Sequence, residues 1–228
     1  MRDNRRNQMG YIGHGNEQQL AYTGSRFTIT AHDDNELEVK IIRLFNENTL
    51  FQTALEFREK STRFHPGEGA IVGVHTQEIL EYCDKMSARY PSWRNDWRLR
   101  SALMIHDLGK KWEYDFPRKR SHQKLSAEST EILGEIGDET IRKLVEHHDD
   151  YYKLYAGRAH TNYRMIFIAT YHGMSQSLME TLIRLEYADT YRLAEYTPLM
   201  RDMRSEVEWH VGECQKMGLV NQNFKVFS

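Results

Sequence analysis

The sequence predicts an all-α fold, in which a helical bundle over residues 36–228 follows a mostly irregular extension over residues 1–35. Three observations support this prediction. Apolar residues recur at intervals of three and four along most of the chain, which is the period of an amphipathic helix. The 228 residues include only 4 prolines, and proline is the residue that helix interiors tolerate least. Apart from a short strand candidate at residues 26–30, no alternation of apolar and polar residues indicates a sheet.

The predicted extension is polar. Asn, Gln, Arg and Gly are scattered through residues 1–35 without an apolar period. Its basic residues are not followed by an apolar stretch, so we do not expect a secretory signal. A chain of 228 residues suits one large domain, and we place its boundary with the extension at residues 35 and 36.

Eight segments have the pattern of helices. Asp and Asn residues precede the first one, Ser92 or Asn95 is the expected N-cap of the third, and Gly109 is the expected end of that helix. Pro198 lies near the first turn of the last segment, where proline is tolerated. The predicted helices span residues 33–60, 70–90, 92–109, 121–137, 138–155, 162–173, 175–196 and 198–218.

Composition excludes several classes of protein. The formal net charge is -2, so the chain lacks the overall basic field of a dedicated nucleic-acid binder, although a local basic groove stays open. No apolar run approaches the roughly 18 residues that a membrane helix needs. The two cysteines, Cys83 and Cys214, do not make a disulfide framework. Free thiols in a reducing compartment are the simplest interpretation, and we therefore expect a cytoplasmic protein.

Histidines and aspartates interrupt the apolar faces of several predicted helices. The chain has 11 histidines; His75 lies on an apolar stripe, and His106 and His148 each follow apolar residues of their helices by three and four positions. A single histidine on such a face is more often a hydrogen-bonded core residue than a ligand. Asp107 and Asp189 are harder to explain, because a buried carboxylate needs a partner or a metal. The joint pattern is stronger than its parts: one His, then His-Asp, then His, then His-His, then Asp follow one another along the predicted helices, and helical bundles build metal sites from such inward-facing side chains.

This order of residues resembles the HD-domain superfamily of metal-dependent phosphohydrolases. His106 and Asp107 lie in the sequence HDLGK at the end of an apolar helix, and Asp189 lies in YADTYR. The resemblance covers about residues 65–195 of this chain. The additional His122 and the adjacent pair of histidines after it are similar to the binuclear branch of the superfamily.

The resemblance implies two divalent transition-metal ions, which could be Mn, Fe, Co, Ni or Zn. Asp107 would bridge them. His75, His106 and Asp189 would complete one coordination sphere, and His122, His147 and His148 would complete the other. The donor set contains no thiolate, which argues against a structural zinc site. Two ions about 3.5–4 Å apart can activate a hydroxide and hold a phosphoryl oxygen.

Three cations are candidates for binding a substrate phosphate. Lys110 follows the His106–Asp107 pair, and the resemblance places it at the mouth of the active site, where it would be catalytic together with Asp107. The alternative is that Lys110 interacts with the helix dipole. Arg192 and Arg158 are weaker candidates, because surface roles are common for arginines.

We therefore expect an enzyme, a metal-dependent phosphohydrolase that cleaves a phosphate ester, most simply of a nucleotide. Three alternatives stay open: an HD-type nuclease acting on single-stranded nucleic acid, an HD-type diiron oxygenase of a small polyol or phosphonate, and a non-catalytic module that keeps the fold. No membrane partner is expected, and the sequence does not indicate an oligomeric state. Five other histidines fall outside the pattern and are expected to be structural or at the surface: His14, His32, His160, His172 and His210.

Overall fold

The computed structural model describes residues 36–58, 71–94, 96–115, 121–131, 138–150, 163–196 and 203–228. These residues form helices and turns, and the only β-type pairing that they contain is an isolated bridge between Arg58 and Ile71. The predicted all-α fold is therefore confirmed. Residues 1–35, for which we expected an irregular extension, lie outside the described residues.

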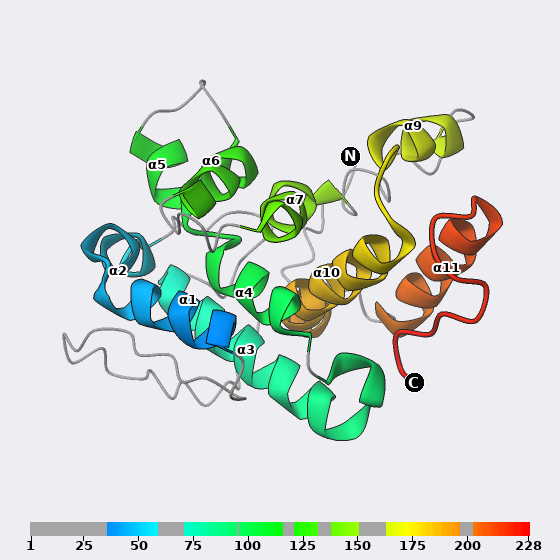
Figure 1. Ribbon diagram of the computed structural model, residues 1–228, viewed down its shortest axis with the longest axis horizontal. Coiled ribbons are helices and arrows are strands. Elements are labelled where there is room, and N and C mark those ends of the chain that lie inside the picture. The colour runs from blue at the N-terminus through cyan, green and yellow to red at the C-terminus, as the bar shows by residue number, and fades with distance from the viewer. Residues whose placement is uncertain are drawn as a thin grey trace, which may run out of the picture.

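The helices form a bundle around one shared core (Figure 1). In chain order they are α1 (Glu36–Glu47), α2 (Thr49–Leu55), α3 (Val72–Arg89), the 3-10 helix η1 (Pro91–Trp93), α4 (Trp97–Ile105), α5 (Gly109–Asp115), α6 (His122–Ser129), α7 (Glu139–His147), α9 (Tyr163–Thr170), α10 (Gln176–Tyr196) and α11 (Met203–Lys216).

Helix α4 lies at the centre of the bundle and contacts α1, α3, α6, α7 and α10 (Figure 1). Every residue from Leu99 to Ile105 is buried, including the polar Arg100 and Ser101. A helix segment that is buried all round needs other helices on all its faces. Arg98 in the first turn of α4 is exposed, whereas the last turn of α4 is fixed by packing.

Two helices begin or end at other residues than we had predicted. The segment 33–60 is not one helix, because Asn48 ends α1 and caps α2, where its side chain accepts hydrogen bonds from the N–H groups of Leu50 and Phe51. The third predicted helix begins neither at Ser92 nor at Asn95. Asp96 is its N-cap and accepts a hydrogen bond from the Leu99 N–H. In both cases a local side-chain hydrogen bond determines the boundary.

The C-terminal segment after α11 packs against η1. The indole N–H of Trp93 donates to the Val226 carbonyl at 2.7 Å, and the N–H of Ser92 donates to the Ser228 carbonyl at 3.0 Å. The ring of Tyr187 lies between those of Trp93 and Phe227, with centroids 6.2 and 5.0 Å away. The C-terminus is therefore part of the core and holds α10 against η1.

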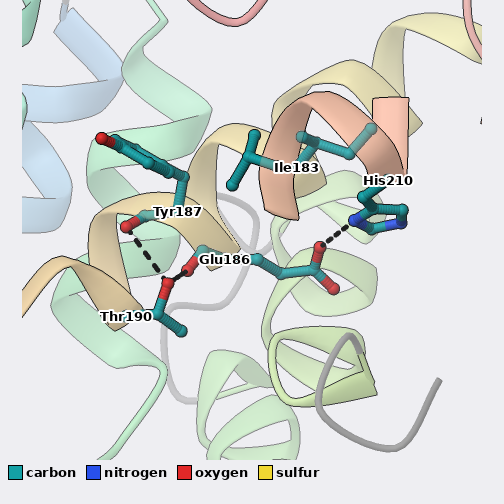
Figure 2. A pocket seen from close by; sticks show the side chains of 6 residues that line it. Ile183, Glu186, Tyr187, Thr190 and His210 are labelled. Carbon is teal, nitrogen blue, oxygen red and sulfur yellow. Dashed lines mark hydrogen bonds and ion pairs between the residues drawn. The ribbon is translucent and has the colours of Figure 1, made fainter. Parts of the chain in front are cut away.

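Helix α11 packs against α10 through a buried polar pair. Figure 2 shows Glu186 of α10 facing His210 of α11, with His210 Nδ1 3.7 Å from Glu186 Oε2. Both residues are almost completely buried. Burial lowers the pKa of His210 to about 3. His210 thus lies in the packing between α10 and α11, and the sequence analysis had expected it to be structural or at the surface.

Both cysteines, Cys83 and Cys214, are buried free thiols, as predicted. Within the described part of the chain, no helix has the length and apolar character needed to cross a membrane.

Candidate metal centre

The adjacent His106 and Asp107 lie in a tight turn between α4 and α5. His106 is the C-cap of α4, and its N–H donates to the Ala102 carbonyl. The N–H of Lys110 donates to the Asp107 carbonyl at 3.1 Å, so α5 begins within three residues. The turn follows the fully buried end of α4, and both His106 and Asp107 are buried with it. The apolar helix thus fixes the backbone from which the two polar side chains project.

We had predicted that Gly109 ends the third helix, and this prediction was wrong. Gly109 is the first residue of α5, and its backbone does not adopt the positive φ of a C-terminal glycine cap. A methyl group at this position would meet the His122 carbonyl and would lie 2.7 Å from the Ser126 nitrogen. Glycine is required because α5 and α6 approach each other here. This close approach also brings His122, the first residue of α6, to the turn.

Three helices contribute to a first group of candidate ligands: His75, His106 and Asp189. The Oδ1 atom of Asp189 on α10 lies 2.9 Å from His75 Nε2 and 3.2 Å from His106 Nε2. The Oδ2 atom of Asp107 lies 3.6 and 3.3 Å from the same two nitrogens. Two imidazoles and two carboxylates therefore converge on one point.

The second oxygen of Asp107 faces a second group of candidate ligands, which consists of Asp107, His122 and His148. Asp107 Oδ1 lies 3.9 Å from His122 Nε2 and 3.8 Å from His148 Nε2. The imidazoles of His122 and His148 have their ring centroids 5.3 Å apart. The carboxylate of Asp107 thus stands between two groups of imidazoles and presents one oxygen to each.

Backbone carbonyls orient two of these imidazoles. His106 Nδ1 lies 2.8 Å from the Leu103 carbonyl, and His148 Nδ1 lies 2.6 Å from the Val145 carbonyl. A carbonyl only accepts, so each Nδ1 must donate a proton, and in the neutral imidazole Nε2 then carries the lone pair. The Nε2 atom of His148 is buried and has no hydrogen-bond partner among the described residues. Metal-binding histidines are typically held by such contacts from the nitrogen that does not bind the ion.

One acidic residue at this site was missed by the sequence analysis. Asp149 Oδ2 lies 3.0 Å from His122 Nε2 and accepts a hydrogen bond from Gln123 at 2.8 Å. Asp149 Oδ1 lies 3.7 Å from His148 Nε2, and Asp149 forms a third group with His148 and Asp189. The feature of the sequence that could have indicated Asp149 is the run His-His-Asp-Asp at residues 147–150. Since α7 ends at His147, helical periodicity could not show which of these side chains point to the site.

His147 is not brought to the cluster. Its Nδ1 lies 2.6 Å from Asp150 Oδ2, and its ring stands edge-on to Tyr171. Among the described residues, His147 belongs to none of the three candidate ligand groups. The other six predicted ligands come together, and Asp149 lies beside His122 and His148, the group to which we had assigned His147.

The three predicted phosphate-binding residues have different outcomes. Lys110 lies at the cluster, where its ammonium is 2.7 Å from Asp107 Oδ2 and its side chain is largely buried. Arg192 belongs to α10, one turn beyond Asp189, but its side chain is outside the described part of the structure. Arg158 also lies outside the described residues. Only Lys110 is therefore placed beside the candidate ligands.

The charges of the cluster compensate one another. Burial opposes ionisation of His106, but Asp107 and Asp189 outweigh it and raise the pKa of this imidazole well above its usual value. Burial likewise opposes the ionisation of Asp107 and Asp189, yet His106 holds the pKa of both carboxyls well below the usual range. His148 differs, because burial lowers its pKa. A neutral imidazole and ionised carboxylates are the forms that bind metal ions.

The buried histidines and aspartates could hold a metal ion. Their donors are imidazole nitrogens and carboxylate oxygens, and the orphaned His148 Nε2 is the kind of atom that an ion would satisfy. The sequence matches no protein-family model, no curated protein and no solved structure. The interpretation of this site therefore depends on its geometry and on the order of its residues in the chain.

Proposed function

We propose that this protein is a metal-dependent phosphohydrolase that cleaves a phosphate ester, with a nucleotide as the substrate class. The observation that carries the proposal is the position of Asp107. Its two carboxylate oxygens face two separate groups of imidazoles, at 3.3–3.6 Å on one side and 3.8–3.9 Å on the other. A buried carboxylate in this position is suited to join two ions.

The described residues provide donors for two divalent ions. One ion would be held by His75, His106, Asp189 and Asp107 Oδ2, and the other by His122, His148 and Asp107 Oδ1, with Asp149 beside it. Imidazole and carboxylate donors suit Mn, Fe, Co, Ni or Zn. Two such ions, when bound, supply a nucleophile from water near neutral pH and neutralise charge on a phosphoryl group.

Lys110 supports hydrolysis of a phosphate ester in particular. Its ammonium lies at the cluster, 2.7 Å from Asp107 Oδ2. In the reaction, water adds to phosphorus, the bond from phosphorus to the ester oxygen breaks, and the leaving oxygen takes a proton. Negative charge develops on the phosphoryl oxygens during this step, and a cation fixed beside them lowers its energy. We assign this role to Lys110.

The helices keep the ligands in position. His106 and His148 are oriented by carbonyls of their own helices, and both are almost inaccessible to solvent. Preorganised groups of this kind need little rearrangement when charge develops. The chain's contribution is thus the fixed orientation of imidazoles from α3, α4, α6 and the end of α7 around one carboxylate.

The test combines metal analysis with a substrate screen. Full-length protein, purified without added metal, is analysed for bound metals and then assayed with nucleotides, phosphomonoesters, cyclic dinucleotides and single-stranded DNA. We expect phosphate release that His106→Ala and Asp107→Ala abolish while both variants keep their helical circular dichroism. Cleavage of DNA without phosphate release would indicate the nuclease instead. Bound iron with oxygen consumption and no phosphatase activity would indicate the oxygenase, and a chain that binds no metal would exclude all three enzymes.

A further inference from the structure

Gln123 places a buried amide beside the metal cluster. It follows His122 in the first turn of α6 and is only 6% exposed. Its Nε2 atom donates a hydrogen bond to Asp149 Oδ2 at 2.8 Å. A carboxylate only accepts, so the amide must turn its nitrogen toward Asp149. Gln123 therefore reaches the cluster as a donor, through Asp149.

Asp149 lies beyond the end of α7, where a regular helix no longer fixes its side chain. Helix α7 ends at His147, and the side chain of Asp149 is 25% exposed. A side chain in such a place has several conformations open to it unless a neighbour holds it. Two neighbours on α6, which contacts α7, lie against Asp149 Oδ2: His122 Nε2 at 3.0 Å and the Gln123 amide.

The other oxygen of Asp149 faces the candidate ligands. Asp149 Oδ1 lies 3.7 Å from His148 Nε2, a buried nitrogen that has no hydrogen-bond partner among the described residues. Asp149 also forms a group with His148 and Asp189 whose ligand atoms lie within 4.8 Å of one another. Ligand atoms lie about 2 Å from an ion, so two ligands of one ion are about 3–4 Å apart. Asp149 is therefore within reach of an ion held by His122 and His148.

A carboxylate from Asp149 would give both ions the same kinds of donor. The first group of candidate ligands provides two imidazoles and two carboxylates, whereas the second has two imidazoles and only the carboxylate of Asp107. Asp149 supplies the missing carboxylate. The amide of Gln123 is neutral, so it can hold this carboxylate without adding a positive charge that would repel the ion.

We propose that Gln123 is a positioning residue of the metal centre, and that its amide fixes the Asp149 carboxylate as a ligand of the ion held by His122 and His148. Hydrogen-bond partners of metal ligands typically contribute about 10- to 100-fold to metal affinity. The inference rests on the metal centre of the proposed function, but it does not depend on the substrate or on hydrolysis.

The test is titration of the metal-free full-length protein with Co²⁺, followed by calorimetry and by visible absorption. We expect two binding steps, of which His75→Ala should remove one and His148→Gln the other. Gln123→Met keeps the length of the side chain but has no amide. It should weaken the step that His148→Gln removes about tenfold or more and change the absorption of that ion, while the other step changes less than about threefold.

A double-mutant cycle separates positioning from a general effect on the fold. Asp149→Asn should also weaken the step about tenfold or more, and adding Gln123→Met to it should then change the affinity less than about threefold. Gln215→Met on α11 is the matched control, because the Gln215 amide donates to the carbonyls of Gln222 and Phe224. This control should retain both steps. An equal loss for Gln123→Met in the wild type and in Asp149→Asn would overturn the proposal.

An NMR measurement on the metal-free protein decides the question if Gln123→Met does not fold. The side-chain amide protons of Gln123 should shift in Asp149→Asn and stay unchanged in Asp150→Asn, because Asp150 contacts His147 instead. Unchanged Gln123 signals in Asp149→Asn would overturn the proposal. Two Co²⁺ steps without phosphate release would contradict the proposed hydrolase activity alone. A wild type that lacks the step assigned to His148 would overturn the inference itself.

Discussion

The N–H of Gly109 donates a hydrogen bond to the hydroxyl of Ser126 at 2.7 Å, and this contact joins the start of α5 to α6. We predict that Gly109→Ala destabilises the protein by about 1–3 kcal/mol, because the added methyl group would collide with backbone atoms of α6. The shift of α6 should also displace His122 and weaken metal binding. Urea denaturation and metal titration measure the two effects.

Gly212 on α11 offers a matched control. A methyl group at Gly212 meets no atom within 4 Å, and the residue lies within a helix. Gly212→Ala should leave the free energy of unfolding unchanged or raise it by up to about 1 kcal/mol, because alanine favours helix. Equal stabilities of the Gly109→Ala and Gly212→Ala variants would contradict the close approach of α5 and α6.

The neighbouring histidines at the end of α7 should respond differently to substitution. His148→Gln removes a nitrogen that faces Asp107, so we expect metal affinity to fall at least about tenfold. His147→Gln changes a side chain that contacts Asp150, and it should change metal affinity less than about threefold. Metal titration of both variants checks this. A larger loss for His147→Gln would restore the ligand role that the sequence analysis gave to His147.

The helices could be predicted from the sequence because burial of one face imposes a period of about 3.6 residues on apolar positions. Their ends could not, because they depend on single hydrogen bonds. Asn48 divides the predicted first helix, and Asp96 caps α4 in place of its neighbours. Several polar residues adjoin each boundary, and only the folded backbone determines which of them reaches an N–H group.

For the candidate site, too, residues on regular helices could be predicted, and residues beyond the helix ends could not. His75, His106 and Asp189 lie within regular helices or directly at their ends, where spacing indicates the buried face. Asp149 follows the end of α7 and lies in a turn, where successive side chains no longer have a helical spacing. The reason for the glycine at position 109 could not be predicted either, because the close contact comes from α6 and not from the segment that contains Gly109.

Replacing Lys110 by methionine should raise metal affinity and lower the catalytic rate. Its ammonium lies 2.7 Å from Asp107 Oδ2, so Lys110→Met removes a positive charge that competes with an ion. We expect metal affinity to increase and, if the protein is a phosphohydrolase, kcat to fall about 10²-fold or more. Lys111→Met is the control for charge, because Lys111 lies near the Phe57 ring. Loss of metal affinity in Lys110→Met would contradict the assignment.

The buried pair of His210 and Glu186 predicts how stability depends on pH (Figure 2). The pKa of His210 is lowered from 6.5 to about 3 by burial, so His210 is neutral in the folded protein at pH 5 while the unfolded chain takes up a proton. Its contribution to stability is therefore complete above pH 6.5 and is lost as the pH falls toward 3, by up to about 1.4 kcal/mol per pH unit. Urea denaturation between pH 7 and pH 4 should show this loss for the wild type, and His210→Gln should reduce the slope. A wild type that becomes more stable as the pH falls below 6.5, with His210→Gln removing that gain, would instead mean that His210 is charged against Glu186.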